Sequence, residues 1–184
     1  MRVALFGGSF DPPHVGHQMA MLYVLATARV DRLLMVPCFR HPFDKRLRAY
    51  EHRLAMARLA AEPFDGRVEV SDVERRLGGE SRTLNTVKAL YAERPGIRIG
   101  VVIGADLLGE RERWWGYPEL MRLVDFIVVG RAGHVAPDAG APVALPDVSS
   151  TEIRARLARG ESVKGLVPSA VLDYIAAQGL YREG

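Results

Sequence analysis

Cysteine is nearly absent from this sequence, as are long apolar runs and a strong net charge. Cys38 is the single cysteine in 184 residues, so no internal disulfide can form, and we expect a reducing, cytoplasmic location. No apolar run approaches the roughly 18 residues of a membrane span, and the N-terminal one breaks at Gly7-Gly8, too early for a signal peptide. The net charge of +3 is too small to indicate a nucleic-acid partner. The sequence therefore predicts neither a membrane protein nor a nucleic-acid-binding protein.

Short apolar segments alternate with longer segments of helical character along the chain. A continuously apolar segment that ends at Gly or Pro is typical of a strand covered on both faces, and strand–helix alternation predicts a parallel sheet. The predicted strands are residues 3–6, 33–36, 68–70, 97–103 and 126–129, with a short sixth one at 143–145. We therefore predict an α/β fold, a Rossmann-like doubly wound parallel sheet with helices on both faces, in one domain of residues 1–184.

Apolar residues at a spacing of three or four mark the predicted helices and their buried faces. The first helix repeats them at Val15, Met19, Leu22 and Ala26, and the second at Tyr50, Leu54, Ala57 and Ala61. A last helix is predicted over residues 168–178, with Gly179 in the position that commonly ends a helix.

The stretch from Leu5 to His17, LFGGSFDPPHVGH, is the most distinctive in the chain. It reads as a strand that ends at Gly7-Gly8, a turn, and the start of a helix. The first N–H groups of a helix lack partners and attract anions, and glycine lets a backbone approach a phosphate. His14 and His17 are three residues apart and share one helix face. With no Gly-Lys-Ser/Thr P-loop, no G-x-G-x-x-G spacing and no nucleophile beside a base, the stretch predicts a site that holds a polyphosphate.

Other chemistry-bearing stretches each allow two interpretations. The basic stretch of residues 38–48 is either a solvated loop or a clamp on phosphates. Asp106 follows a strand, where it is either a helix cap or a ligand contact at the edge at which α/β sheets bind ligands. Of the adjacent Trp114 and Trp115, we expect one indole to be a stacking platform and the other to lie in the core.

Two motifs together resemble those of a known superfamily. Residues 148–154, VSSTEIR, have the Ser/Glu spacing of a capping box, so by themselves they are either a cap or a second phosphate-binding helix start. However, GGSFDPPHVGH resembles the G-x-F-x-P-x-H-x-G-H motif of the nucleotidylyltransferase superfamily, and VSSTEIR is similar to its I-S-[SA]-T-x-I-R motif. The resemblance favours phosphate binding at both. It implies that His14 and His17 contact the triphosphate of a nucleotide, and it implies the strand order 3-2-1-4-5.

A finer resemblance, to the nicotinate-nucleotide adenylyltransferases, covers nearly the whole chain. It rests on IGADLLGERERWW (103–115), on Ser81-Arg82-Thr83 with Thr86, and on the C-terminal LVP…GLY segments. The resemblance implies adenylyl transfer from ATP to nicotinate mononucleotide, in NAD biosynthesis. The chain departs from the family at residues 41–45, HPFDK in place of P-P-H-K, and at Arg82 in place of Tyr.

The resemblance also implies which residues form the site. The implied catalytic residues are His14, His17, Lys45 and Arg154. The implied ATP-binding residues are Gly7, Gly8, Ser9, Phe10, His14, Gly16, His17, Gly104, Asp106, Ser149, Thr151 and Arg154. The implied acceptor-binding residues are Asp11, Lys45, Thr83, Trp114 and Arg131.

The altered loop at residues 41–45 leaves other activities open. One alternative is an adenylyltransferase that acts on another phosphate monoester, such as nicotinamide mononucleotide or phosphopantetheine. Another is a catalytically inactive nucleotide-binding protein. We expect no metal site in the protein itself and Mg²⁺ bound mainly through the ATP phosphates; a homodimer is left open.

Overall fold

The computed structural model describes residues 1–41, 47–131 and 144–182, and its strands form one parallel sheet. The strands are β1 (Arg2–Gly8), β2 (Arg32–Pro37), β3 (Val68–Val70), β4 (Arg98–Gly104), β5 (Asp125–Arg131) and β6 (Ala144–Leu145). Their order is β3-β2-β1-β4-β5-β6. This confirms the predicted order 3-2-1-4-5 and adds the short sixth strand at its edge.

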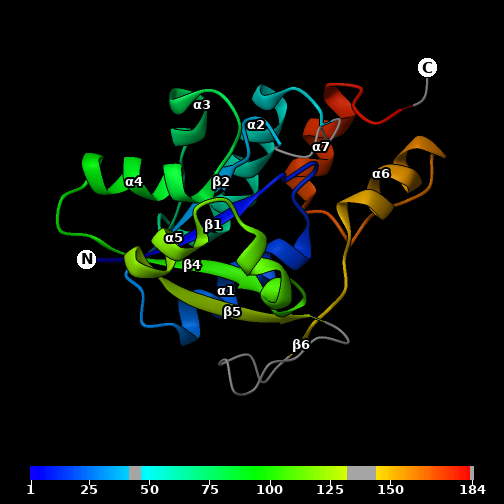
Figure 1. The fold of residues 1–184 in the computed structure, drawn as a ribbon. Coiled ribbons are helices and arrows are strands. Elements are labelled where there is room, and N and C mark those ends of the chain that lie inside the picture. The colour runs from blue at the N-terminus through cyan, green and yellow to red at the C-terminus, as the bar shows by residue number, and fades with distance from the viewer. Residues whose placement is uncertain (42–46, 132–143, 183–184) are drawn as a thin grey trace.

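Helices cover both faces of this sheet, as predicted (Figure 1). The α-helices are α1 (Val15–Thr27), α2 (Tyr50–Ala61), α3 (Val73–Leu77), α4 (Thr83–Glu93), α5 (Tyr117–Leu123), α6 (Ser150–Ala158) and α7 (Ser169–Ala177), and the 3-10 helices are η1 (Glu62–Phe64) and η2 (Ala105–Arg113). Sequence reasoning missed α3, α5 and both 3-10 helices. Among the helices in the described ranges, none has the length and apolarity that crossing a bilayer would require.

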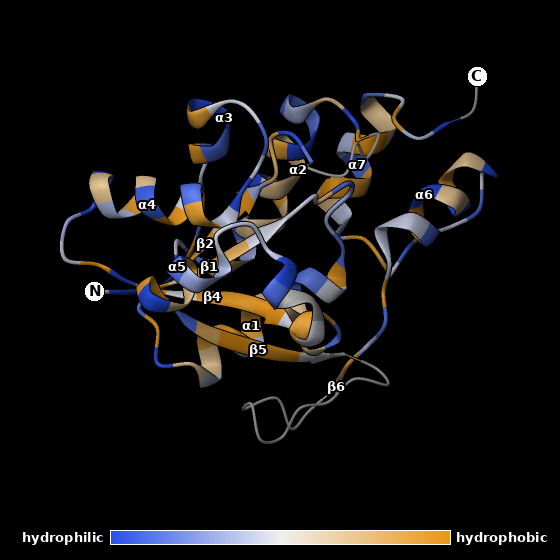
Figure 2. Cartoon of the chain, in the orientation of Figure 1, coloured by the Kyte–Doolittle hydropathy of each residue, from blue (hydrophilic) through white to orange (hydrophobic). Residues whose placement is uncertain are grey.

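Alternate residues of the strands supply two separate cores. Ala4 and Met35 face α1 and α2, whereas Val3 and Leu5 face α3, α4 and α5. Helices α6 and α7 pack on the outer side of α2 in a third cluster, around Met56. Figure 2 shows the hydrophobic strands β4 and β5 inside and hydrophilic residues on the outer helices. The two-sided burial explains why β1, β2, β4 and β5 are continuously apolar over most of their length.

The predicted buried face of α1 is wrong. Met19 and Leu22 are 39% and 62% exposed, whereas Met21 and Val24 are fully buried. Apolar residues surround most of this helix, so its pattern offers little contrast between faces. By comparison, the predicted face of α2 is confirmed, since all four of its predicted residues are buried.

The two central strands separate before they end. β1 pairs with β2 as far as Gly8 and Pro37, but its pairing with β4 stops at Leu5 and Val101. β4 nevertheless continues beside β5 as far as Gly104. The carboxyl ends of β1 and β4 therefore diverge, at the point where the strand order reverses and α/β folds bind ligands.

Candidate functional site

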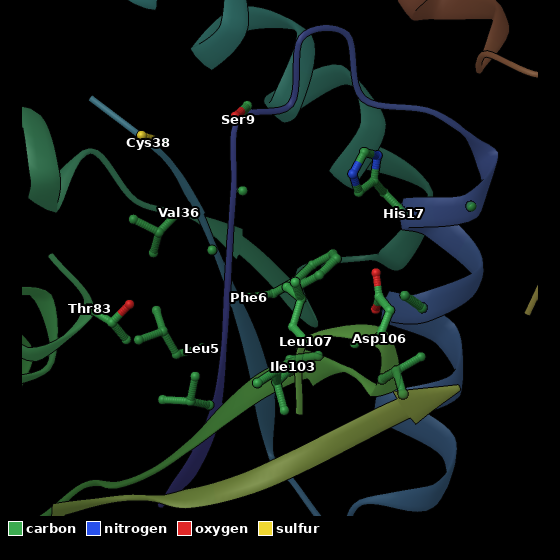
Figure 3. Close-up of a pocket in the computed structure, with 18 of the residues that line it drawn as sticks. Leu5, Phe6, Ser9, His17, Val36, Cys38, Thr83, Ile103, Asp106 and Leu107 are labelled. Carbon is green, nitrogen blue, oxygen red and sulfur yellow. The ribbon is translucent and has the colours of Figure 1, made fainter. Parts of the chain in front are cut away.

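A pocket of about 450 Å³ opens between the diverging ends of β1 and β4. Figure 3 shows His17 and Asp106 at one side of this pocket and Thr83 at the other, with β1 between them. Ten of the predicted site residues line it: Gly7, Gly8, Ser9, His14, Gly16, His17, Thr83, Gly104, Asp106 and Trp114. The structure thus brings together residues that are about a hundred positions apart in the sequence.

Glycine at the end of β1 and at the start of α1 allows side chains to pack closely around the turn between them. A Cβ on Gly8 would lie 2.9 Å from the ring of Phe10, which is itself fully buried beneath the turn. A Cβ on Gly16 would lie 3.0 Å from Nδ1 of His14. Phe10 therefore supports the turn by packing against Phe6 and His17, and it does not line the pocket.

The two histidines of the motif form one unit at the start of α1. Their rings stack with centroids 3.7 Å apart, and the backbone N–H of His14 donates to Nδ1 of His17 over 3.1 Å. Because Nδ1 accepts, the proton of a neutral His17 ring lies on Nε2, which can donate to a ligand. No acidic residue in the first turn of α1 offsets the positive end of its helix dipole. This end of the pocket is suited to an anion.

The start of α6 adjoins the same turn. Ser149 caps the helix by accepting from the N–H of Thr151 at 3.2 Å, and Ser150 donates to the carbonyl of Pro12 at 2.9 Å. The Arg154 guanidinium donates to the carbonyl of Asp11 at 2.7 Å and to Thr151 Oγ1 at 3.2 Å. The two predicted phosphate-binding helix starts are therefore neighbours, although Ser149, Thr151 and Arg154 do not line the pocket.

The buried side chain of Arg53 connects the segments around the pocket through hydrogen bonds. Arg53, 1% exposed, donates to the carbonyl groups of Arg48, Ser9, Cys38 and Phe39. Burial lowers the pKa of this guanidinium, which still stays charged at neutral pH. Sequence reasoning gave Arg53 no role, although its place in the buried stripe of α2, three residues after Tyr50 and four before Ala57, was a visible signal.

Asp11 is buried as deeply as Arg53. One of its carboxylate oxygens accepts from the Arg48 N–H at 3.1 Å and the other from the Tyr181 hydroxyl at 2.5 Å. Asp11 does not line the pocket, and its carboxylate is not exposed for the predicted contact with the acceptor.

The far end of the pocket is formed by α3 and α4, through Glu74, Thr83 and Thr86. Arg82 precedes α4 without a side-chain cap, so Thr83 presents the open start of this helix to the pocket. Glu74 accepts from the Phe39 N–H at 3.1 Å and the Thr86 hydroxyl at 3.0 Å. Burial raises the pKa of the Glu74 carboxyl, and these hydrogen bonds oppose that shift.

The two tryptophans differ in their surroundings. Trp114 lines the pocket and packs edge-on against Phe126, with ring centroids 6.3 Å apart. Trp115 is 55% exposed, so the prediction that the second indole lies in the core is wrong. The chain returns to the core in the helix that follows, α5, through Leu120.

Some predictions fall outside what the structure describes. Lys45 lies in residues 42–46, outside the described ranges, and the side chain of Arg131 is not described either. His41 lines the pocket next to the first of these. Within the described residues, no group of three or more His, Cys, Asp or Glu side chains could hold a metal ion.

Comparison with known proteins identifies relatives over the full length. The cytidylyltransferase-like family matches residues 5–156. A probable nicotinate-nucleotide adenylyltransferase of Anaeromyxobacter dehalogenans (strain 2CP-C) is 50% identical over 183 residues, covering 98% of this chain and 96% of that protein. Its counterpart in Myxococcus xanthus (strain DK1622) is 41% identical over 181 residues, covering 98% and 95%.

Solved structures resemble the fold as well. The Plasmodium falciparum nicotinic acid mononucleotide adenylyltransferase complexed with NaAD superposes with a TM-score of 0.83 at 20% sequence identity. The match covers 98% of this chain and 97% of that one. At this identity the likeness establishes a shared fold.

Proposed function

Because this chain belongs to the nicotinate-nucleotide adenylyltransferase family, we propose that it transfers the adenylyl group of ATP to nicotinate mononucleotide, giving deamido-NAD and pyrophosphate. The observation that carries the proposal is the shape of the pocket, which runs from the start of α1 at His17 to the start of α4 at Thr83. Two helix starts at opposite ends suit a substrate pair with anionic groups at both ends.

The reaction joins two phosphates without a covalent enzyme intermediate. The 5′-phosphate of nicotinate mononucleotide attacks the α-phosphorus of ATP, a new P–O bond forms, and the bond to pyrophosphate breaks. A phosphate monoester is already anionic near neutral pH, so the step needs no general base. The protein's contribution is then positioning and the stabilisation of developing charge.

The α1 end of the pocket would hold the triphosphate. His14, His17 and the backbone around Gly16 supply N–H groups there, and His17 Nε2 would donate to the α-phosphate oxygens on which charge develops. The adjoining α6 start would extend this surface through Ser149, Thr151 and Arg154. The Arg154 guanidinium has five N–H donors, so its two bonds within the chain leave capacity for a phosphate. We assign the ribose contact to Asp106.

The α4 end would hold the acceptor. Its open helix start at Thr83 would receive the carboxylate of the pyridine ring, since backbone N–H groups there have no side-chain cap. The Trp114 indole would stack on the ring. Lys45 would neutralise phosphate charge between the two substrates.

Mg²⁺ would enter with ATP. The α1 end offers imidazoles, backbone N–H donors and one carboxylate, that of Asp106, whereas a hard cation needs several oxygen ligands. The ion would therefore be held mainly by the phosphate oxygens, where it offsets their charge.

Choice of acceptor tests the proposal directly. Purified protein with ATP and Mg²⁺ is offered nicotinate mononucleotide, nicotinamide mononucleotide or phosphopantetheine, and pyrophosphate release is measured. A charge-assisted bond to the carboxylate favours the acid over the amide by about 10- to 100-fold in kcat/KM. Comparable rates with acid and amide would contradict the assigned acceptor. Binding of ATP without pyrophosphate from any acceptor would identify an inactive nucleotide-binding protein.

The adjacent tryptophans offer a matched pair for the stacking role. Trp114→Ala is expected to raise the KM for nicotinate mononucleotide about 10-fold, because stacking of a ring on an aromatic side chain contributes roughly 1–3 kcal/mol. Trp115→Ala removes an exposed indole next to it and serves as the control. Steady-state kinetics with varied acceptor at saturating ATP measure both. Equal KM values in the two variants would rule out Trp114 as the platform.

A further inference from the structure

The turn between β1 and α1, residues 9–12, is held by side chains from three distant parts of the chain. Its backbone and its single carboxylate accept hydrogen bonds from Arg53 on α2, from Ser150 and Arg154 on α6, and from Tyr181 after α7. The two histidines follow this turn directly. Its position therefore fixes where their imidazoles point.

Tyr181 is the most distant of these side chains, 170 residues from its partner Asp11. Both residues are buried, at 3% and 1% exposure. The other oxygen of Asp11 accepts from the Arg48 N–H, and the Arg48 guanidinium lies 5.2 Å from the centre of the Tyr181 ring. The Tyr181 hydroxyl is thus one of two described donors to a buried carboxylate.

The chain adopts an unfavourable backbone conformation to place this hydroxyl. α7 ends with bonds from Gly179 N–H to the Ala176 carbonyl and from Leu180 N–H to the Ile175 carbonyl. Tyr181 then has φ +63°, a left-handed conformation that residues other than glycine rarely adopt. Such positions persist where surrounding contacts determine them, often at functional sites.

The hydroxyl remains a donor under assay conditions. Burial, and then the hydrogen bond to Asp11, raise the pKa of the Tyr181 hydroxyl well above its usual range. It therefore keeps its proton near neutral pH. Because the hydroxyl keeps its proton, the contact serves positioning rather than proton transfer.

We propose that Tyr181 is a positioning residue for adenylyl transfer: through the Asp11 carboxylate it holds the 9–12 turn so that His14 and His17 meet the phosphates in the reactive geometry. Without the hydroxyl, a buried carboxylate oxygen loses its donor and the turn shifts to find another. This inference rests on the proposed function, because the displaced groups are those that contact ATP.

Tyr181→Phe tests the proposal while it keeps the ring and its packing. We expect kcat to fall about 10-fold with the KM for ATP changed less than about 3-fold, because small misplacements cost more in the transition state than in binding. Tyr174→Phe is the matched control: its hydroxyl lies 2.9 Å from His52 Nδ1, between α7 and α2 and away from the turn. Thermal unfolding of both variants measures the purely structural loss.

Each outcome decides between positioning and packing. A selective fall of kcat in Tyr181→Phe, beyond that in Tyr174→Phe at similar stability, supports the proposal. An unchanged kcat, or a loss that merely follows stability in both variants, overturns it. The wild-type protein separates the two hypotheses: if it turns over nicotinate mononucleotide, only the positioning role is at stake, and if it does not, both fail.

A second variant changes the other partner of the Tyr181–Asp11 hydrogen bond. Asp11→Asn keeps an oxygen for the Arg48 N–H but can place an amide opposite the Tyr181 hydroxyl. If the two residues act through one bond, the double variant loses no more kcat than the single variant with the larger loss. Losses that multiply would overturn the shared role. Should Tyr181→Phe not fold, an unchanged kcat in Asp11→Asn overturns it as well.

Discussion

His17→Ala is expected to lower kcat by about 10²- to 10³-fold, the cost of removing one donor that stabilises charge in a transition state. The ring of His17 lines the pocket, and its Nδ1 accepts from the His14 N–H, which directs the proton of a neutral ring to Nε2. The KM for ATP should change far less, because the backbone N–H groups of α1 remain.

His17→Asn separates the phosphate contact from local structure. Its side-chain oxygen can still accept from the His14 N–H, but its amide cannot reach as far as Nε2, so we expect the large loss of kcat to remain. His52→Ala, on α2, is the control, because its ring pairs with Tyr174 away from the pocket. Steady-state assays of pyrophosphate release measure the effect, and circular dichroism verifies that each variant is folded. Near-normal kcat in His17→Asn would show that His17 only supports the turn.

The strands were predictable from their apolar pattern, whereas their order and the site residues were predictable from the family resemblance. The strands β1, β2, β4 and β5 pack against helices on both faces and therefore read as continuous apolar runs. The motif around His17 and the one around Arg154 carried the resemblance, which implied residues that the structure places in the pocket between β1 and β4. Ten predicted residues line that pocket.

Helix faces and short helices were less predictable, for physical reasons. α1 is apolar nearly all round, so only its packing decides that Met21 is buried and Leu22 exposed. The α3 helix has five residues, too few for a period of 3.6 to show. Trp115 lies at the surface because the chain turns at Gly116, which has φ +71°, before α5 begins.

Apart from Arg53, which lies in the buried stripe of α2, the residues that support the site could not be predicted, because they make contacts between distant segments. The resemblance assigned Asp11 to the acceptor and Arg154 to the phosphates. In the structure Asp11 meets Tyr181, and Arg154 reaches back to the Asp11 carbonyl. No local pattern encodes such pairs, since each partner is chosen by the fold.

Arg53→Met is expected to destabilise the protein by about 3–5 kcal/mol, the cost of breaking a buried, hydrogen-bonded charge. Methionine fills the space of the stem but donates to none of the four carbonyl groups that Arg53 now serves. Those carbonyls belong to the turn after β1 and to the segments that flank residues 42–46. We therefore expect kcat to fall as well, because the segments around the pocket lose the hydrogen bonds that hold them in place.

Arg58→Met is the matched control, since Arg58 is an exposed arginine on the same helix. There we expect a change within about 0.5 kcal/mol, as is usual for surface substitutions. Urea unfolding gives the free energies, and the slope with urea shows whether the native state has loosened. Arg53→Lys places a charge at the same site without the planar fork of donors, so it should recover only part of the loss. Full recovery with lysine would mean that charge alone is sufficient, and the argument from four fixed carbonyl contacts would be wrong.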